Sequence, residues 1–108
     1  MGCDLAASGN FAAAITKWNE GLIYDNNNHI LYELLAQGYI QLERWFDAVQ
    51  SANRSVAIDP HWSESRLTLA RAQRELGEVE LSLQSYKIAV ELDPCNQEAI
   101  SELAEIEV

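Results

Sequence analysis

The sequence lacks both a long apolar run and a basic flank at its N-terminus. Its apolar stretches reach only five residues, as in Phe11 to Ile15, whereas roughly 18 are needed to cross a bilayer. The opening residues, MGCDL, do not have the pattern of a secretory signal. We therefore expect no membrane association and an intracellular protein, in the cytoplasm or nucleus, unless the chain was cut from something larger.

Basic residues are scarce. Seven lysines and arginines stand against 17 acids, which gives a net charge of -10. That charge repels phosphate backbones, so we expect no direct nucleic-acid partner. From Glu75 onward there are nine acids and a single basic residue, Lys87. This half would favour a basic partner, or it is simply a solvated helical face.

Residues that could support chemistry are also few. Cys3 and Cys95 lie near opposite ends of the chain and are expected to be free thiols. His29 and His61 have no cysteine or histidine neighbour at metal-ligand spacing, so a capping or surface role is expected for them. No glycine-rich phosphate loop and no strand-to-helix serine motif are present. We expect no catalytic residue, no metal, no cofactor and no enzyme activity.

What the sequence does have is a period of 34 residues. A shift of 34 places residues of like size in the same columns, and a fixed period of this length is typical of helical repeat arrays. The clearest columns are Leu35, Leu69 and Leu103; Ala36, Ala70 and Ala104; Ala14, Ala48 and Ser82; and Leu22, Val56 and Val90. Small residues in such columns allow neighbouring helices to approach closely.

Each period divides into two amphipathic halves. From residue 30 to 42 and from 46 to 58, apolar residues recur mainly at steps of three and four, the spacing of one helical face. Pro60 and Pro94 end the second helix of their periods, because proline cannot continue a helix interior. Each period therefore predicts a helical hairpin.

A glycine column lies between the two helices of a period. Gly9 and Gly77 predict a left-handed cap at this turn, where a residue without Cβ is favoured. Glu43 takes the same place in the middle period. The turn there must either avoid positive φ or tolerate some strain.

These columns resemble the tetratricopeptide repeat, a 34-residue helix-turn-helix unit. The matching residues are Tyr32, Leu35, Ala36, Tyr39, Ala48 and Pro60 in one repeat, and Leu69, Ala70, Gly77, Tyr86, Ala89 and Pro94 in the next. Arg66, Gln73 and Ala52 depart from the family pattern. The resemblance implies an all-α, right-handed superhelical solenoid of antiparallel helix hairpins, with about seven helices.

The resemblance also divides the chain, which we expect to form one array. Residues 1–28 would be a partial first repeat, 29–62 the second repeat, 63–96 the third and 97–108 a C-terminal capping helix. In that capping helix Ile100 and Leu103 would face inward. Its glutamates would be more exposed: Glu98, Glu102, Glu105 and Glu107.

In this family the first helices of the repeats line a concave groove. The corresponding positions here are Cys3 and Ala6, then Ile30, Glu33, Gln37 and Ile40, then Glu64, Leu67, Arg71 and Arg74. The isoleucines and leucine could supply apolar contact, and the two arginines could pair with a carboxylate or backbone carbonyl of a partner. Alternatively, the arginines pair with nearby Glu64, Glu75 or Glu78, as surface arginines often do.

One subset of the family grips the C-terminal carboxylate of chaperones through a lysine, two asparagines, a lysine and an arginine. This sequence departs from that set. Cys3 and Leu34 hold the asparagine places, and Glu64 and Thr68 hold the basic places of the third repeat. The resemblance therefore implies a protein or peptide partner that is not a chaperone tail.

Three functional readings follow. The first is a protein-protein interaction scaffold that binds a partner segment in the groove. The second is a substrate-recruiting or regulatory fragment of a larger multidomain enzyme. The third is a self-associating array, because the partial repeat at the N-terminus leaves an apolar end that another copy could cover.

Overall fold

The computed structural model describes residues 2–107, and the side chains of residues 9–107. Its helices are α1 (Gly2–Tyr24), α2 (His29–Gln41), α3 (Trp45–Ile58), α4 (Ser63–Leu76), α5 (Val79–Leu92) and α6 (Gln97–Glu107). The described residues contain no strand. The all-α solenoid expected from the repeat is confirmed, with six helices where about seven were expected.

The first helix accounts for that difference. The turn predicted at Gly9 is wrong, because α1 runs unbroken from Gly2 to Tyr24. A Cβ placed on Gly9 would meet no atom within 4 Å, so this glycine is not required by packing. Three alanines follow at residues 12–14, and alanine is the strongest helix former. A glycine inside an exposed helix costs only about 1 kcal/mol, which this alanine-rich sequence offsets.

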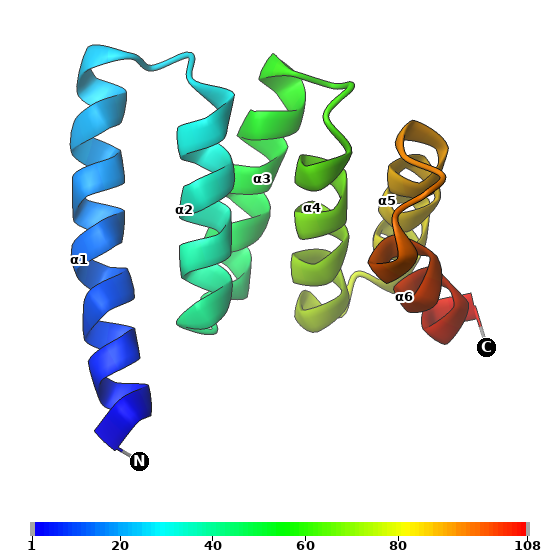
Figure 1. Cartoon of the computed structure of the whole chain (residues 1–108), viewed down its shortest axis with the longest axis horizontal. Helices are drawn as coiled ribbons and strands as arrows, with labels where there is room; N and C mark the ends of the chain where they lie inside the picture. The colour runs from blue at the N-terminus through cyan, green and yellow to red at the C-terminus, as the bar shows by residue number, and fades with distance from the viewer. Residues whose placement is uncertain (1, 108) are drawn as a thin grey trace.

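The helices stack side by side in chain order (Figure 1). Helix α2 pairs with α3 and α4 pairs with α5, while α1 packs on α2 and α6 on α5. The first helices α2 and α4 also contact each other directly. In Figure 1 α3 is seen between α2 and α4, with its lower part behind α2. Together α2 and α4 form one face of the stack.

Two turns show how the hairpins close. At the end of α4, Gly77 has φ 91°, and the N–H of Glu78 donates to the Gln73 carbonyl at 2.9 Å. At the end of α2, Glu43 has φ 58°, and the N–H of Arg44 donates to the Tyr39 carbonyl at 2.9 Å. Both are left-handed helix ends with a six-to-one hydrogen bond. Glu43 therefore adopts positive φ and tolerates the strain that Gly77 avoids.

The small-residue columns hold the hairpins together. Of their members, Ala36, Ala48, Ala70 and Ser82 are completely buried. Gly38 has a similar role where α1 crosses α2, since a Cβ there would lie 3.0 Å from the Trp18 ring. These close approaches build a continuous core in which each hairpin covers the apolar side of the next.

Helix α6 is rotated relative to the orientation expected from the sequence. Ala99 is fully buried, and Leu103 and Ile106 pack with it against the core formed by α4 and α5. Ile100, which was expected to face inward, is exposed. The buried stripe therefore follows steps of four and three from Ala99, so the prediction for Leu103 is confirmed and that for Ile100 is wrong.

Candidate functional site

The residues predicted to line the groove lie on α2 and α4, except Cys3 and Ala6, whose side chains are outside the described residues. Ile30, Gln37, Glu64 and Arg74 are exposed, and Ile40 and Arg71 are partly buried. We call these six the α2–α4 face. Glu33 and Leu67 are buried, at 2% and 3% exposure, so they support the face from beneath and offer no surface to a partner.

Glu33 forms the contact between α2 and α4. Its Oε2 accepts hydrogen bonds from the Thr68 hydroxyl and, at 2.7 Å, from Gln37 Nε2. Its Oε1 is buried without a hydrogen-bond partner among the described residues. Burial raises the pKa of the Glu33 carboxyl to about 7, although the two hydrogen bonds act to lower it. We call this contact the α2–α4 seam.

A different kind of contact joins α4 to α6. The Arg71 guanidinium donates to both carboxylate oxygens of Glu102, with Nε to Oε1 at 2.9 Å and Nη2 to Oε2 at 2.7 Å. The same Nη2 also lies 2.7 Å from Glu98 Oε2. Hydrogen bonding from Arg71 holds the pKa of the Glu102 carboxyl below its usual value. We call this contact the α4–α6 seam.

Tyr86 of α5 completes the α4–α6 seam. It is fully buried, and its hydroxyl donates to Glu102 Oε1 at 2.8 Å. Burial raises the pKa of this hydroxyl to about 12. Tyr86 therefore remains a donor at all physiological pH values, and it ties the carboxylate of α6 to the core.

The arginine pairings differ from those expected. Glu64, Glu75 and Glu78 were the suggested partners, but the carboxylates that bind Arg71 and Arg74 come from α6. Arg74 Nη1 lies 3.3 Å from Glu105 Oε2, in an exposed pair. The expected partners were acids nearby in the sequence, whereas these bonds join residues 31 apart, about one period.

A cavity of about 220 Å³ opens beside the α4–α6 seam. Its walls combine apolar and charged groups from five helices: Ile40, Trp45, Arg71, Arg74, Glu75, Tyr86 and Glu102. Sequence reasoning did not include Trp45, Tyr86 and Glu102 in the site. Their position in the repeat could have suggested them, since Glu102 lies about one period after a first-helix groove residue, Arg71.

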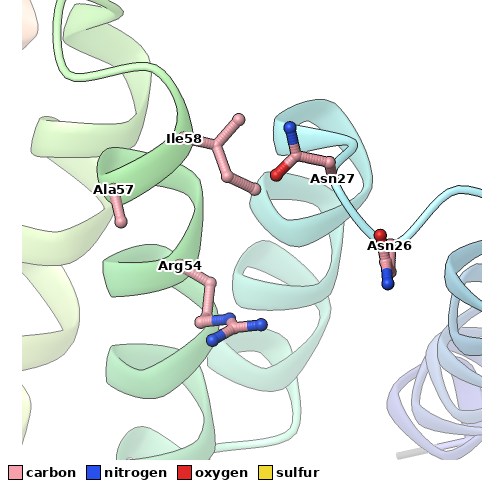
Figure 2. A pocket seen from close by; sticks show the side chains of 5 residues that line it. All are labelled: Asn26, Asn27, Arg54, Ala57 and Ile58. Carbon is pink, nitrogen blue, oxygen red and sulfur yellow. The ribbon is translucent and has the colours of Figure 1, made fainter.

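A second cavity of about 420 Å³ lies between the α1–α2 loop and the last turns of α3, lined by Asn26, Asn27, Arg54, Ala57 and Ile58 (Figure 2). In Figure 2 the Arg54 side chain extends from α3 toward α2. Its guanidinium lies over the Tyr32 ring, 5.5 Å from the centroid. The Tyr32 hydroxyl in turn donates to the Asn26 carbonyl at 3.3 Å. These contacts anchor the loop to the hairpin.

His29 packs against the turn that follows α3. Its ring meets Trp62 edge to face, with centroids 5.0 Å apart, and its Nε2 lies 3.5 Å from Asp59 Oδ2. In the same turn the His61 backbone N–H donates to Asp59 Oδ1 at 3.3 Å, and His61 is exposed. Among the described residues no three His, Cys, Asp or Glu side chains gather as metal ligands would. The described helices also include none long and apolar enough to span a bilayer.

The chain is similar in sequence to tetratricopeptide repeat protein 33 of Homo sapiens. The two are 39% identical over 97 residues, which cover 90% of this chain and 37% of that protein. Three short runs predict this relationship, and the comparison confirms it: Lys17–Glu20, Leu31–Glu33, and Arg71–Gln73 followed by Leu76–Glu78. The chain thus spans little more than a third of this relative. No protein-family model matches the chain.

Two further similarities come from chaperone-related proteins. Heat shock protein STI1 of Saccharomyces cerevisiae is 35% identical over 77 residues, covering 71% of this chain and 13% of that protein. Among solved structures, the first TPR of Spaghetti (RPAP3), bound to the HSP90 peptide SRMEEVD, has a TM-score of 0.89 and 27% identity. That match covers 92% of this chain and 79% of the solved chain.

Proposed function

Because the chain is a tetratricopeptide repeat array, we propose that it is a protein-interaction scaffold that holds a partner segment in a groove along the α2–α4 face. The relatives support the general role, since one solved neighbour is bound to a peptide of HSP90. No catalytic step is part of the proposal. An intracellular location, in the cytoplasm or nucleus, is a prediction consistent with it.

The observation that supports this face is its exposed apolar and hydrogen-bonding surface. Ile30 is 51% exposed although isoleucine is usually buried, and the polar side chains of Gln37 and Glu64 on the same face are exposed too. The cavity beside Ile40 and Trp45 continues the same face toward the other end of α4. An extended segment could therefore contact Ile30 and fill the cavity with a single apolar side chain.

We further propose that the scaffold does not clamp a chaperone C-terminal carboxylate. Leu34 and Thr68 cannot supply the amide and cationic groups expected at their positions, and the Thr68 hydroxyl already donates to Glu33. Arg71 is bound on two sides by carboxylates of α6. A partner carboxylate would have to displace these contacts before it could bind Arg71.

Substitution of Ile30 tests the groove. Ile30→Ser removes the exposed apolar contact without changing charge, and Val79→Ser on α5 is the matched control, since Val79 is 53% exposed but lies outside the α2–α4 face. Partners recovered by affinity purification from cells should be lost from the Ile30 variant by about tenfold and retained by the Val79 variant. Equal recovery by both variants would place the binding surface elsewhere.

Self-association is the second candidate, and α1 supplies the observation for it. In the complete repeats Ala48 and Ser82 are completely buried, but Ala14 in the same column is only partly buried. Ile23 and Tyr24 at the end of α1 are also exposed. Another copy could pack against exposed positions of α1. Sedimentation over a range of concentrations decides the point, because a strictly monomeric chain excludes it.

The third candidate is a recruiting or regulatory role within a larger protein, including a multidomain enzyme. The limited share of the human relative that this chain spans, 37%, favours it. The interaction face would be the same, so intact mass and the full open reading frame would separate this candidate from a free-standing scaffold.

A further inference from the structure

We propose that the α2–α4 face selects a basic partner segment, in which a lysine or arginine lies a few residues from one large apolar side chain. This inference rests on the proposed groove and adds the chemistry of its ligand. It reverses the first expectation from the sequence, in which Arg71 and Arg74 would attract a carboxylate.

The balance of charges along the face indicates that the ligand is positively charged. Two guanidinium groups, on Arg71 and Arg74, are each paired with carboxylates of α6. Apart from Glu33, whose carboxyl holds its proton up to about pH 7, five carboxyl groups lie along the face, the cavity and these pairs: Glu64, Glu75, Glu98, Glu102 and Glu105. With these five ionised, five against two leaves three negative charges in excess. A cationic segment is therefore attracted and an acidic one repelled.

A second, independent observation is the buried acceptor in the seam. Glu33 is 2% exposed, and its Oε1 has no hydrogen-bond partner among the described residues. Glu64 of α4 is close enough to disfavour the charge on Glu33 further. A cation held at Glu64 would offset the repulsion between these two carboxyl groups, and in a partly dehydrated site such an effect is stronger than in water.

The spacing within the ligand follows from helix geometry. Glu64 lies near the start of α4, while Arg71 and Glu75 line the cavity near its end. Seven to eleven residues of helix correspond to about 10–16 Å. An extended chain covers that distance in about three to five residues. The basic side chain at Glu64 and the apolar side chain in the cavity, against Trp45, should be separated by that number of residues.

An acidic segment is the clearest contrast. The peptide SRMEEVD, which the first TPR of RPAP3 binds, carries three acidic side chains against one arginine. On this chain it would meet like charge at Glu64, and Arg71 would already be occupied by Glu102. We expect the two related arrays to prefer ligands of opposite charge.

Selection from a phage-displayed library of random dodecapeptides tests the inference. The library is first depleted on the Ile30→Ser chain and then selected on the native chain. We expect enriched peptides to carry lysine or arginine about three to five residues from a leucine, methionine or aromatic residue. Their affinity, measured by fluorescence anisotropy, should fall with added salt, because salt screens exposed charges.

A variant of Glu64 and a matched control test whether Glu64 binds the basic side chain of the peptide. Glu64→Gln should weaken the selected basic peptides by about fivefold, the size of a partly exposed charge contact, whereas Glu91→Gln on the exposed side of α5 should leave them unchanged. Enriched peptides that are acidic or uncharged would overturn the basic preference and leave the groove intact. If no peptide is enriched that depends on Ile30, both the groove and its preference are overturned.

Discussion

The two seams between neighbouring first helices use the same residue type in opposite electrostatic settings. At the α2–α4 seam, Glu33 is buried among neutral donors, and its pKa rises to about 7. At the α4–α6 seam, Glu102 binds Arg71 in a two-pronged ion pair, and its pKa falls. A glutamate between helices is thus neutralised by a proton in one seam and by a guanidinium in the other.

The difference has a functional consequence. In the α4–α6 seam the charged groups bind one another. Arg71 and Tyr86 bind the Glu102 carboxylate, and Glu98 also binds Arg71. The α2–α4 seam retains a buried oxygen, Glu33 Oε1, without a hydrogen-bond partner among the described residues. A buried polar group left unsatisfied costs free energy within the folded chain, and Glu33 offers no surface through which a ligand could recover it. We place the ligand's basic group at exposed Glu64, next to the first seam, because the α6 carboxylates of the second seam are already paired with Arg71.

The largest expected effect comes from removing the charge of Glu33. Its pKa is higher in the folded chain than its ordinary value of 4.5, so the folded state binds the proton more tightly. The resulting stability is fully present below pH 4.5 and is lost as the pH rises through 7. Glu33→Gln does not titrate, so it should be more stable than the native chain by about 3 kcal/mol at pH 8 and nearly equal at pH 4.5.

Urea unfolding at several pH values would check this expectation. Glu64 and Arg71 of α4 also act on Glu33, the first raising and the second lowering its pKa, so both must remain intact. Glu91→Gln, an exposed acid on α5, serves as the control and should leave the pH profile unchanged. A Glu33→Gln chain whose stability tracks that of the native chain at every pH would refute the assignment.

The next effect in size comes from breaking the α4–α6 seam. Arg71→Ala leaves Glu102 without its main counter-charge and should destabilise the chain by about 2 kcal/mol, the usual value for charged hydrogen bonds. Arg44→Ala removes an exposed ion pair with Asp47 and should cost less than about 0.5 kcal/mol. If both variants lose the same small amount in urea unfolding, the two-pronged pair contributes little.

The smallest effect concerns a turn outside both seams. Glu43 has φ 58° where Gly77 occupies the equivalent turn of the next repeat. Glu43→Gly should relieve strain and raise the free energy of unfolding by about 1 kcal/mol, while the shape of the pH profile stays that of the native chain. A changed profile would show that the pH dependence does not belong to the seams alone. No gain in thermal or urea stability would show that the turn is not strained.

Much of the fold was predictable because repeated columns encode it. The columns of Leu35 and Ala36 identified the buried positions of the complete repeats, and Pro60 correctly marked the end of a helix. The break at Gly9 was predicted wrongly, since a glycine column shows only that positive φ is permitted, and the alanines after it favour continued helix.

The site was harder to predict because its contacts join different repeats. Glu33 and Thr68 are 35 residues apart, and Arg71 and Glu102 are 31 apart. The expected partners of the arginines were acids nearby in the sequence. The 34-residue period predicts these contacts better, because residues about one period apart on first helices become neighbours. The rotation of each helix decides whether the carboxyl group of such a neighbour is buried or paired with a cation. The columns do not specify that rotation.

The opposite settings of Glu33 and Glu102 underlie both the structural account and the proposed ligand. Carbon-13 NMR of the side-chain carboxyl groups, followed from pH 3 to pH 9, measures them directly. We expect Glu33 to titrate near pH 7 and Glu102 below its ordinary value of 4.5. If both carboxyl groups titrate together near 4.5, the two seams are electrostatically alike and the account is contradicted.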